Sequence, residues 1–326
     1  MSGVTSRDVA REAGVSQNTV SLVLRDSPRV REETKAAVRR AAERLGYRSN
    51  GLAAALRSRS TPMVLFVVAQ AHVHDHVTAG LLAGAIEGAE ARGCSVIVLA
   101  EDVRAPGRAA EAYRSRWASG AVVIPAARED PLTASLVAAG CPTVVLARPP
   151  AGWPADRQVR ADDPGGARQA VQHLLGRGHR RIGIVGVGTS GTGLDGDRVS
   201  AARAAAEAAG AAVVEVPAGG WTREHGQEAA RRLLAADPQP TALFAVSDRL
   251  AFGALAVAAG CGLRVPADLA VVGFDNVEWA EWSDPPLTTV EFPLREIGRR
   301  GVGLVLGGSE AGGAAVPTRL VVRRSS

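Results

Sequence analysis

Residues 4–25 read VTSRDVAREAGVSQNTVSLVLR, and this stretch constrains the fold and the function of the chain more strongly than any other. Two short helical patterns meet at Gly14, and apolar residues at helical spacing give the pair a small shared seam. The seam consists of Val9, Val15, Val20 and Val23. Two short helices joined by a tight turn are typical of a helix-turn-helix, whose second helix enters the major groove of DNA. The pattern therefore predicts duplex DNA as a partner.

The distribution of charge supports this prediction. Residues 1–60 contain twelve basic and six acidic residues, a net charge of +6, whereas the remaining 26 basic and 27 acidic residues give −1. The excess positive charge therefore lies where a protein would contact phosphate groups. No apolar run approaches the roughly 20 residues that span a bilayer, and the polar N-terminus does not resemble a signal peptide. We therefore expect a cytoplasmic, nucleoid-associated protein with no membrane partner.

Capping residues define the helices of this basic segment. Thr5 and Asp8 form a capping-box pattern that starts a helix over residues 6–13, and Ser16 is placed to cap the second helix. Apolar residues recur at helical spacing over residues 31–45, which predicts a third helix. Three short helices with a shared apolar seam complete the expected DNA-binding module.

The second helix carries polar residues in its first turns, where a recognition helix meets base edges. The side chains predicted to face the bases are Gln17, Asn18 and Ser21. Gln and Asn amides pair bidentately with adenine, and a good pair contributes roughly 1–3 kcal/mol of discrimination. Ser16 and Thr19 are better placed for phosphates, which fix position without specifying sequence. The alternative is that these residues form only a solvated helix face.

At this point the sequence resembles a known family. Residues 4–24, followed by VREETKAAVRRAAERLGYRSN, resemble the headpiece of the lactose-repressor/galactose-repressor (LacI/GalR) family of bacterial transcriptional regulators, and residues 50–57 resemble its hinge helix. The resemblance implies that hinge helices pair in a dimer on DNA and that Leu56 enters the minor groove as an apolar wedge. The alternative for Leu56 is an ordinary linker residue. The expected DNA contacts are Thr5, Ser6, Ser16, Gln17, Asn18, Thr19, Ser21, Leu22, Arg25, Asn50, Ala53, Leu56 and Arg57.

Leu22 departs from the pattern of the lactose repressor, which has a base-reading arginine at this position. A leucine makes no hydrogen bond to guanine, and the most it offers is an apolar contact with a thymine methyl group. We therefore expect this helix to prefer a different operator sequence from that of the lactose repressor.

From residue 62 onward, strand and helix patterns alternate. Continuous apolar strands separated by helices predict parallel sheets covered on both faces, and two such blocks predict two Rossmann-like lobes with chain crossovers. The expected fold is an all-α helix-turn-helix headpiece with a hinge helix, followed by a two-lobed α/β domain like that of periplasmic binding proteins. The expected domains are a headpiece (1–48), a hinge helix and linker (49–60), and an effector-binding and dimerisation domain (61–326), whose N-lobe covers about 61–161 and 290–318 and whose C-lobe covers about 162–289 and 319–326.

The C-lobe resembles the same family in three segments, which are VSDRLAFGA at 246–254, VVGFDN at 271–276 and PPLTTV at 285–290. Ligands in open α/β lobes bind at the carboxyl ends of the strands. The resemblance implies a small, sugar-like effector at that edge. The residues expected to bind it are His76, Arg198, Trp221, Ser247, Asp248 and Asp275. Other roles stay open for three of them, namely a helix cap for Asp248, an ion pair in the cleft for Arg198 and core packing for Trp221.

His72, His74 and His76 stand at alternate positions after the first strand of this domain. A solvated loop is the simplest interpretation, and a metal site, an anion site or a pH-responsive cleft mouth are the alternatives. We expect neither a metal nor a cofactor.

Two other functions stay open. GVGTSG at 186–191 fits the GxGxxG pattern of NAD-type dinucleotide-binding enzymes, but no acidic ribose partner is clearly placed about 20 residues further on. A solute-binding protein would share the two-lobed fold, but the basic headpiece argues against it. No arrangement of catalytic residues is recognisable, so we expect no enzyme. The expected function is a homodimeric, effector-controlled transcriptional repressor that binds a pseudo-palindromic operator.

Overall fold

The structure is a computed structural model in which the chain forms two compact units, Met1–Pro62 and Met63–Ser326. The residues that it describes are 4–24, 27, 29–47, 63–126, 129–147, 149–150, 152–188, 195–236, 239–308, 313 and 315–326. The predicted hinge helix and linker (49–60) lies outside the described residues. The same is true of five predicted DNA contacts, Arg25, Asn50, Ala53, Leu56 and Arg57.

The described part of the first unit contains three helices, α1 (Ser6–Glu12), α2 (Gln17–Leu24) and α3 (Glu32–Arg44). The predicted capping box of α1 is confirmed, because the Asp8 carboxylate accepts hydrogen bonds from the backbone N–H of Thr5 at 2.9 Å and from its hydroxyl at 2.7 Å. The predicted cap of α2 is confirmed as well, because the Ser16 hydroxyl accepts from the N–H of the third residue of that helix at 3.1 Å.

The valine seam forms the core of this unit. Val9 of α1 and Val20 and Val23 of α2 are buried against Val38 and Ala41 of α3. This core is small, since its fully buried members are short aliphatic side chains, with Leu45 and Tyr47 packed against them in part. Hydrophobic burial stabilises a unit of this size modestly, so each of these valines contributes a large share of the total.

The N-lobe of the second unit is built on a five-stranded sheet in the order β2-β1-β3-β4-β5, and all of its neighbouring strands are parallel. Its strands are β1 (Met63–Ala69), β2 (Ser95–Glu101), β3 (Ala121–Ile124), β4 (Thr143–Leu146) and β5 (Gln158–Val159). Its helices are η1 (Gln70–His72), α5 (His76–Glu90), α6 (Arg108–Arg114), α7 (Pro131–Ala138), η2 (Ala155–Arg157) and α13 (Leu294–Val305).

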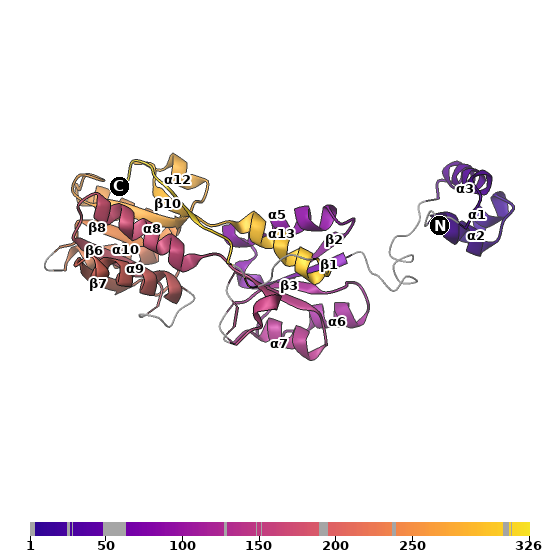
Figure 1. Ribbon diagram of the computed structural model, residues 1–326, viewed down its shortest axis with the longest axis horizontal. Coiled ribbons are helices and arrows are strands. Elements are labelled where there is room, and N and C mark those ends of the chain that lie inside the picture. Colours follow the sequence, from indigo (N-terminus) through magenta and orange to yellow (C-terminus); the bar gives the residue numbers. More distant parts are fainter. Residues whose placement is uncertain are drawn as a thin grey trace. The chain divides into compact units, whose positions relative to one another are not determined.

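Strand β1 is covered on both faces, which explains its continuous apolar sequence. Val64 and Phe66 pack in a cluster with α5 and α13, whereas Leu65 and Val67 pack in a second cluster with α6 and α7. Figure 1 shows α5 and α13 side by side on one face of this sheet and α6 and α7 on the other. The prediction of a parallel sheet between two helical layers is confirmed for this lobe.

Helices α5 and α13 are far apart in the sequence but pack closely on the same sheet face. A Cβ atom at Gly84 of α5 would collide with the backbone of Arg295, and one at Gly298 of α13 would collide with the backbone of Leu81. The two glycines therefore allow the helix backbones to touch. This contact ties the C-terminal part of the chain into the lobe that the N-terminal part of the domain begins.

The C-lobe is built on a six-stranded sheet in the order β11-β10-β9-β8-β6-β7. Its strands are β6 (Arg181–Gly186), β7 (Ala212–Pro217), β8 (Ala242–Ala245), β9 (Ala270–Asp275), β10 (Thr288–Glu291) and β11 (Arg319–Val321). Its helices are α8 (Asp163–Gly176), α9 (Gly196–Ala208), α10 (Arg223–Leu234), α11 (Asp248–Gly260) and α12 (Trp279–Trp282). One strand departs from the expected parallel order, because β11 pairs antiparallel with β10. An edge strand tolerates this arrangement, since doubly wound sheets commonly carry an antiparallel strand at one edge.

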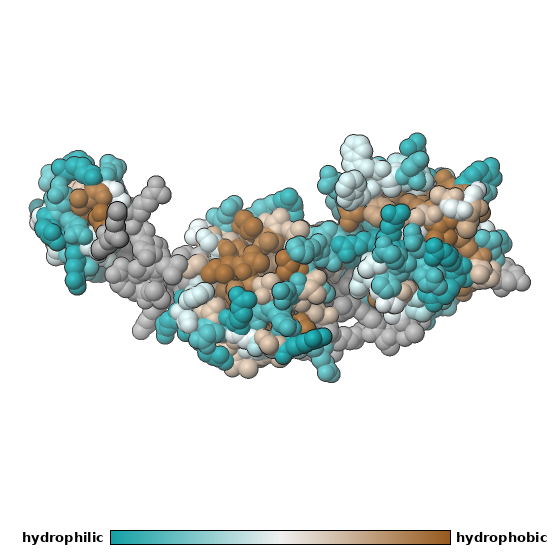
Figure 2. Space-filling model, turned by 180° about the vertical axis from the view of Figure 1, so that it is seen from behind, coloured by the Kyte–Doolittle hydropathy of each residue, from teal (hydrophilic) through white to brown (hydrophobic). Residues whose placement is uncertain are grey.

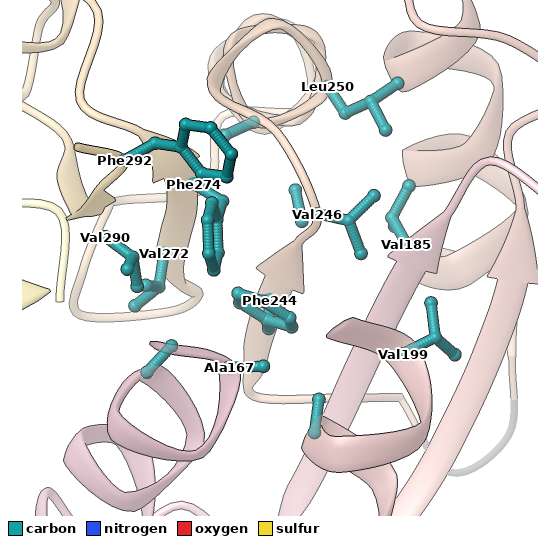
Figure 3. Packing of buried hydrophobic residues seen from close by; sticks show 14 of the residues in the cluster. Ala167, Val185, Val199, Phe244, Val246, Leu250, Val272, Phe274, Val290 and Phe292 are labelled. Carbon is teal, nitrogen blue, oxygen red and sulfur yellow. The ribbon is translucent and has the colours of Figure 1, made fainter. Parts of the chain in front are cut away.

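Neighbouring residues of β9 show that the C-lobe sheet also has two covered faces. A Cβ atom at Gly273 would meet Asp248 and Ala251 of α11, whereas the ring of Phe274 faces Gly166 of α8. Figure 3 shows Phe274 beside Phe244 and Phe292 in this core, with Ala167 of α8 below them. The last residue of β9, Asp275, lies at the carboxyl end of the strand, where ligands of open α/β sheets bind.

The chain passes between the lobes after β5, after β10 and after α13. Two lobes connected by crossovers were expected, and the structure confirms them. None of the described helices is both long enough and apolar enough to span a bilayer.

Candidate ligand pocket and nucleic-acid interface

A cavity of about 210 Å³ lies between the two lobes of the second unit. Side chains that follow the carboxyl ends of strands line it from both sides, as expected for a ligand site in open α/β lobes. Five of the six predicted effector-binding residues line this cavity, namely His76, Arg198, Trp221, Ser247 and Asp275. The structure thus brings together residues that are up to 199 positions apart in the sequence.

Arg198, near the start of α9, is almost fully buried, with 2% of its surface exposed. Its Nε donates to Asp163 Oδ1 at 2.6 Å, and its Nη1 donates to the carbonyl of Val246 at 2.7 Å. The guanidinium carbon lies 3.7 Å from the centre of the Phe274 ring. Burial alone would lower the pKa of Arg198, but Asp163 and Asp275 raise it. Arg198 therefore forms the ion pair that sequence analysis left open, and it lines the cavity as well.

Two residues of the cavity lining have backbone conformations that are unusual for residues other than glycine. Asp275 has a φ of 120° and Ala147 has a φ of 67°. Such conformations cost of order 1–3 kcal/mol each and cluster at ligand-binding sites. At Asp275 the unusual conformation accompanies the turn that ends β9 and brings the carboxylate to the cavity.

His76 lies between two carboxylates. Its Nδ1 is 3.1 Å from Asp75 Oδ1, and its Nε2 is 3.4 Å from Asp275 Oδ2. Burial alone would lower the pKa of His76, but the two carboxylates outweigh burial and raise the pKa to about 9. Asp75 also lies 3.7 Å from Arg249 of α11. Because Asp75 and His76 belong to the N-lobe and the other two residues to the C-lobe, two ionic contacts join the lobes at the cavity.

The structure places Asp248 behind the cavity rather than in its lining. Its carboxylate is fully buried and accepts hydrogen bonds from the hydroxyl of Thr289 at 2.5 Å and from the N–H of Val277 at 2.9 Å. Burial and the like charge of Asp275 raise the pKa of Asp248. The helix cap suggested for Asp248 is provided by Ser247 instead, whose hydroxyl accepts from a backbone N–H of α11 at 3.4 Å. Asp248 therefore holds the segment after β9 in place beneath the ligand-facing residues.

Sequence reasoning missed three charged residues of this site, Asp75, Asp163 and Arg249. Asp75 had a local signal, because it directly precedes α5 and caps it by accepting from the N–H of Val77 at 3.1 Å. Asp163 had no such signal, since its partner Arg198 lies 35 residues away and only the packing of α8 against α9 brings them together.

The three alternating histidines do not converge. His72 and His76 line the cavity, and His74 and His76 line a wider groove of about 750 Å³ together with Trp279 and Trp282. Among the described residues, no group of three or more His, Cys, Asp or Glu side chains is placed to hold a metal ion. The three histidines thus line two adjoining hollows, and His76 lines both of them.

In the first unit, the predicted base-reading side chains lie on the outside of α2. Gln17 and Asn18 are exposed, and Ser21 and Leu22 are half-buried. The Gln17 Nε2 donates to the hydroxyl of Ser6 on α1 at 2.9 Å, so the neighbouring helix orients this amide. An oriented amide on the first turn of a recognition helix is suited to direct contact with a base edge.

The Ser16 and Thr19 hydroxyls, which were expected to face phosphates, lie 2.8 Å apart at the start of the same helix. A helix N-terminus with two hydroxyl groups is a favourable position for a phosphate. The contacts of these two side chains with phosphate stay predictions.

Comparison with known proteins covers both units. Residues 5–50 match the model of the bacterial regulatory proteins of the lacI family, and residues 171–326 match a periplasmic binding protein-like domain. The HTH-type transcriptional regulator CelR of Thermobifida fusca is 35% identical to this chain, and the match covers 96% of this chain and 94% of CelR. The HTH-type transcriptional regulator GalS of Salmonella typhimurium is 32% identical, and that match covers 94% and 90%.

Solved structures agree with these matches. The lac repressor dimer bound to its operator and the anti-inducer ONPF is 26% identical, with a TM-score of 0.85 over 99% of each chain. The complex of the transcriptional regulator CelR with cellobiose is 32% identical, with a TM-score of 0.71 over 99% of this chain and 100% of the other.

Proposed function

The chain belongs to the lacI family of bacterial regulatory proteins, and we propose that it is a homodimeric repressor whose operator affinity is controlled by a carbohydrate. It is a DNA-binding transcriptional regulator with an allosteric ligand site. The observation that carries the proposal is the combination, in one chain, of a helix-turn-helix unit with a cavity between two lobes that charged, hydroxyl and aromatic side chains line.

A carbohydrate suits the cavity because its lining combines polar groups with an aromatic side chain. The carboxylate of Asp275 and the guanidinium of Arg198 supply an acceptor and donors for ring hydroxyls, and Trp221 supplies an apolar face for the ring. The relative CelR is known in a complex with cellobiose. A neutral polyol is therefore the ligand class that we propose.

Control of DNA binding follows from the position of the cavity between the lobes. A ligand that contacts both lobes stabilises the lobe separation at which it binds best. The predicted hinge, residues 49–60, directly precedes β1 of the N-lobe, so we propose that a change in lobe separation changes the pairing of the two hinge segments. The coupling between the sites is expected to be about 1–3 kcal/mol, as is typical of allosteric proteins.

A dimer on a pseudo-palindromic operator is the assembly that we propose, because twofold symmetry of the protein is matched by the DNA. Exposed apolar side chains on both lobes support an association between copies. Trp279 and Trp282 of the C-lobe are 71% and 72% exposed, and Ile86 and Val98 of the N-lobe are 40% and 45% exposed. Figure 2 shows apolar residues gathered on one face of the N-lobe.

We propose that the protein acts in the cytoplasm, at the nucleoid, without catalytic activity. The relatives named above are transcriptional regulators. In the described part of the glycine pattern, residues 186–188, the N–H of Val187 donates to Asp195 Oδ2 at 2.6 Å. An N–H that is already paired with a carboxylate is a poor site for a dinucleotide phosphate.

The proposal is tested by selecting DNA fragments that bind the full chain and then measuring their release by cellobiose, glucose and ribose. Asp275→Asn should preserve operator binding and reduce the affinity for the releasing carbohydrate about tenfold or more, since it removes a charged hydrogen-bond acceptor. Asp268→Asn is the matched control, because this C-lobe carboxylate pairs with Arg264 and does not line the cavity. Equal carbohydrate affinities of the two variants would contradict the assignment of the cavity.

A further inference from the structure

His76 and Asp275 reach the cavity from opposite lobes, and the pair is incompletely hydrogen-bonded. We propose that they hold a single hydroxyl group of the effector between them, so that the histidine selects hydroxylated ligands and links their binding to the approach of the lobes. This inference rests on the carbohydrate effector proposed above. It adds a specificity-determining residue and names the ligand group that this residue binds.

The first observation is an unsatisfied nitrogen. His76 Nε2 is buried and has no hydrogen-bond partner among the described residues. It lies 3.4 Å from Asp275 Oδ2, whereas a hydrogen bond between charged groups is normally about 2.7–2.9 Å long. A buried donor without a partner is costly, so this gap favours a ligand atom that completes the bonding.

The second observation is that neighbouring groups fix the orientation of both partners. His76 Nδ1 faces Asp75 Oδ1 at 3.1 Å, and Asp75 is held by the N–H of Val77 at 3.1 Å. The Nε2 side of the ring therefore faces Asp275. On the other lobe, Asp275 Oδ1 is 3.4 Å from Arg198 Nη1, which leaves Oδ2 as the oxygen on the histidine side.

The chemistry of these two atoms selects a hydroxyl group. Protonated Nε2 is a donor and the carboxylate of Asp275 is an acceptor, and a hydroxyl accepts from one and donates to the other at the same time. An ammonium group has no acceptor for His76, and a carboxylate group has no donor for Asp275. The pair therefore discriminates against charged analogues and against a deoxy sugar that lacks this hydroxyl.

The location of the pair makes the same hydroxyl sensitive to lobe separation. His76 begins α5 of the N-lobe, and Asp275 ends β9 of the C-lobe. A hydroxyl bound to both atoms requires the lobes to be close, so its binding energy is available only in that state. A ligand lacking this hydroxyl would occupy the cavity without the full shift of the lobes.

Because His76 can lose a proton, the affinity for a ligand that carries this hydroxyl group should depend on pH. Asp75, on the same segment as His76, and Asp275 of β9 face the ring directly. The other charged or titratable groups near it are Arg249 and Asp248 of α11, Arg198 with its partner Asp163, and His72 in the same cavity. With its pKa raised to about 9, His76 is protonated at neutral pH. Above that pH, the remaining proton stays on Nδ1 facing Asp75, and Nε2 becomes an acceptor. The hydroxyl then loses one of its two hydrogen bonds.

The experiment uses the full chain and titration calorimetry with cellobiose, glucose and ribose at pH 7.5 and pH 10. The wild-type chain should bind at least one of these carbohydrates about tenfold more tightly at pH 7.5 than at pH 10, because a pKa of about 9 leaves only about a tenth of His76 protonated at pH 10. His76→Leu should lose a similar factor at pH 7.5. His76→Gln keeps a donor that does not titrate, so it should lose less affinity and show no such pH dependence.

His72→Gln is the matched control, since this histidine lines the same cavity but forms no hydrogen bond or ion pair with Asp275 in the described part of the chain; it should leave the affinity and its pH dependence unchanged. Carbohydrate binding that is unaffected by His76→Leu would overturn this inference alone and leave the proposed effector class intact. An equal loss for His72→Gln would overturn it too, because the effect would then belong to the charge of the cavity. If none of the three carbohydrates binds a chain that still binds its operator, the inference falls together with the proposed effector class.

Discussion

The DNA-reading helix and the ligand cavity hold their functional side chains in different ways. On α2, Gln17 and Asn18 are exposed, and the contact that orients Gln17 comes from Ser6 of the adjacent helix. In the cavity, Arg198 is buried and bonds to residues 35 and 77 positions away. Exposed groups with local partners are independent of one another, whereas buried charges with distant partners are coupled.

It follows that the side chains that contact DNA and those that contact the ligand differ in how strongly they affect the stability of the fold. A change on the exposed face of α2 is expected to alter the base preference with little effect on folding, because surface substitutions usually change stability by less than about 0.5 kcal/mol. A change in the cavity alters the electrostatic balance of both lobes, and its effect on ligand binding comes with an effect on folding.

Replacement of the buried arginine is expected to have the largest effect. Arg198→Leu leaves Asp163 and Asp275 buried without their cation, and the loss of one partner of a buried ion pair typically costs about 3–5 kcal/mol. The free energy of unfolding of the second unit, measured by urea denaturation of the full chain, should fall by this amount. Release of the operator by carbohydrate should also be lost.

Arg203→Leu provides the matched control for this prediction. Arg203 lies on the same helix and pairs with Glu215, but its side chain is 33% exposed. A partly exposed pair contributes about 1 kcal/mol or less. Similar destabilisation by Arg198→Leu and Arg203→Leu would show that burial does not increase the cost of losing an ion pair. It would contradict the difference between buried and exposed side chains.

The same contrast explains which features the sequence could predict. The caps at Thr5 and Ser16 and the valine seam of the headpiece depend on neighbours within a few residues, and the structure confirms them. Most strands of both lobes were recognisable because burial on two faces leaves continuous apolar runs, whereas the short strands β5, β10 and β11 were not predicted. Five of the predicted effector-binding residues line one cavity because the carboxyl ends of parallel strands meet at one edge.

The orientation of side chains within the cavity was beyond local patterns. Asp248 and Ser247 are adjacent in the sequence, yet one is buried beneath the site and the other lines it. The position of Asp248 is set by Thr289 and by the segment after β9, both contributed by other parts of the fold. The antiparallel pairing of β11 likewise depends on a chain crossover from the N-lobe and has no local signature.

Truncation of a core valine in the headpiece is expected to have an intermediate effect, confined to one unit. Val38→Ala removes two buried methyl groups and leaves a small cavity, which should destabilise the headpiece by about 2 kcal/mol. Because Val38 belongs to the first unit and the cavity to the second, carbohydrate binding should be unchanged while operator binding weakens. Calorimetric unfolding and ligand titration of the same sample measure both quantities.

Val4→Ala is the control for this truncation, since Val4 is 42% exposed and should contribute little to stability. A loss of carbohydrate affinity in Val38→Ala would show that the units are energetically coupled in the absence of DNA. Such coupling would contradict the expectation that a change in the headpiece core leaves ligand binding by the two-lobed domain unchanged.

Loss of the cap at Ser16 is expected to have the smallest effect and to separate stability from DNA contact within one residue. Ser16→Ala leaves the N–H of Thr19 without its partner and should cost about 1 kcal/mol of headpiece stability. Ser16→Asn keeps a side-chain acceptor at the cap and should restore most of that stability. If the Ser16 hydroxyl also contacts a phosphate, Ser16→Asn should still bind the operator more weakly than the wild-type chain. Full recovery of operator affinity in Ser16→Asn would mean that the Ser16 side chain affects DNA binding only by stabilising α2. DNA binding by this exposed helix would then depend on its stability, against the contrast with the cavity.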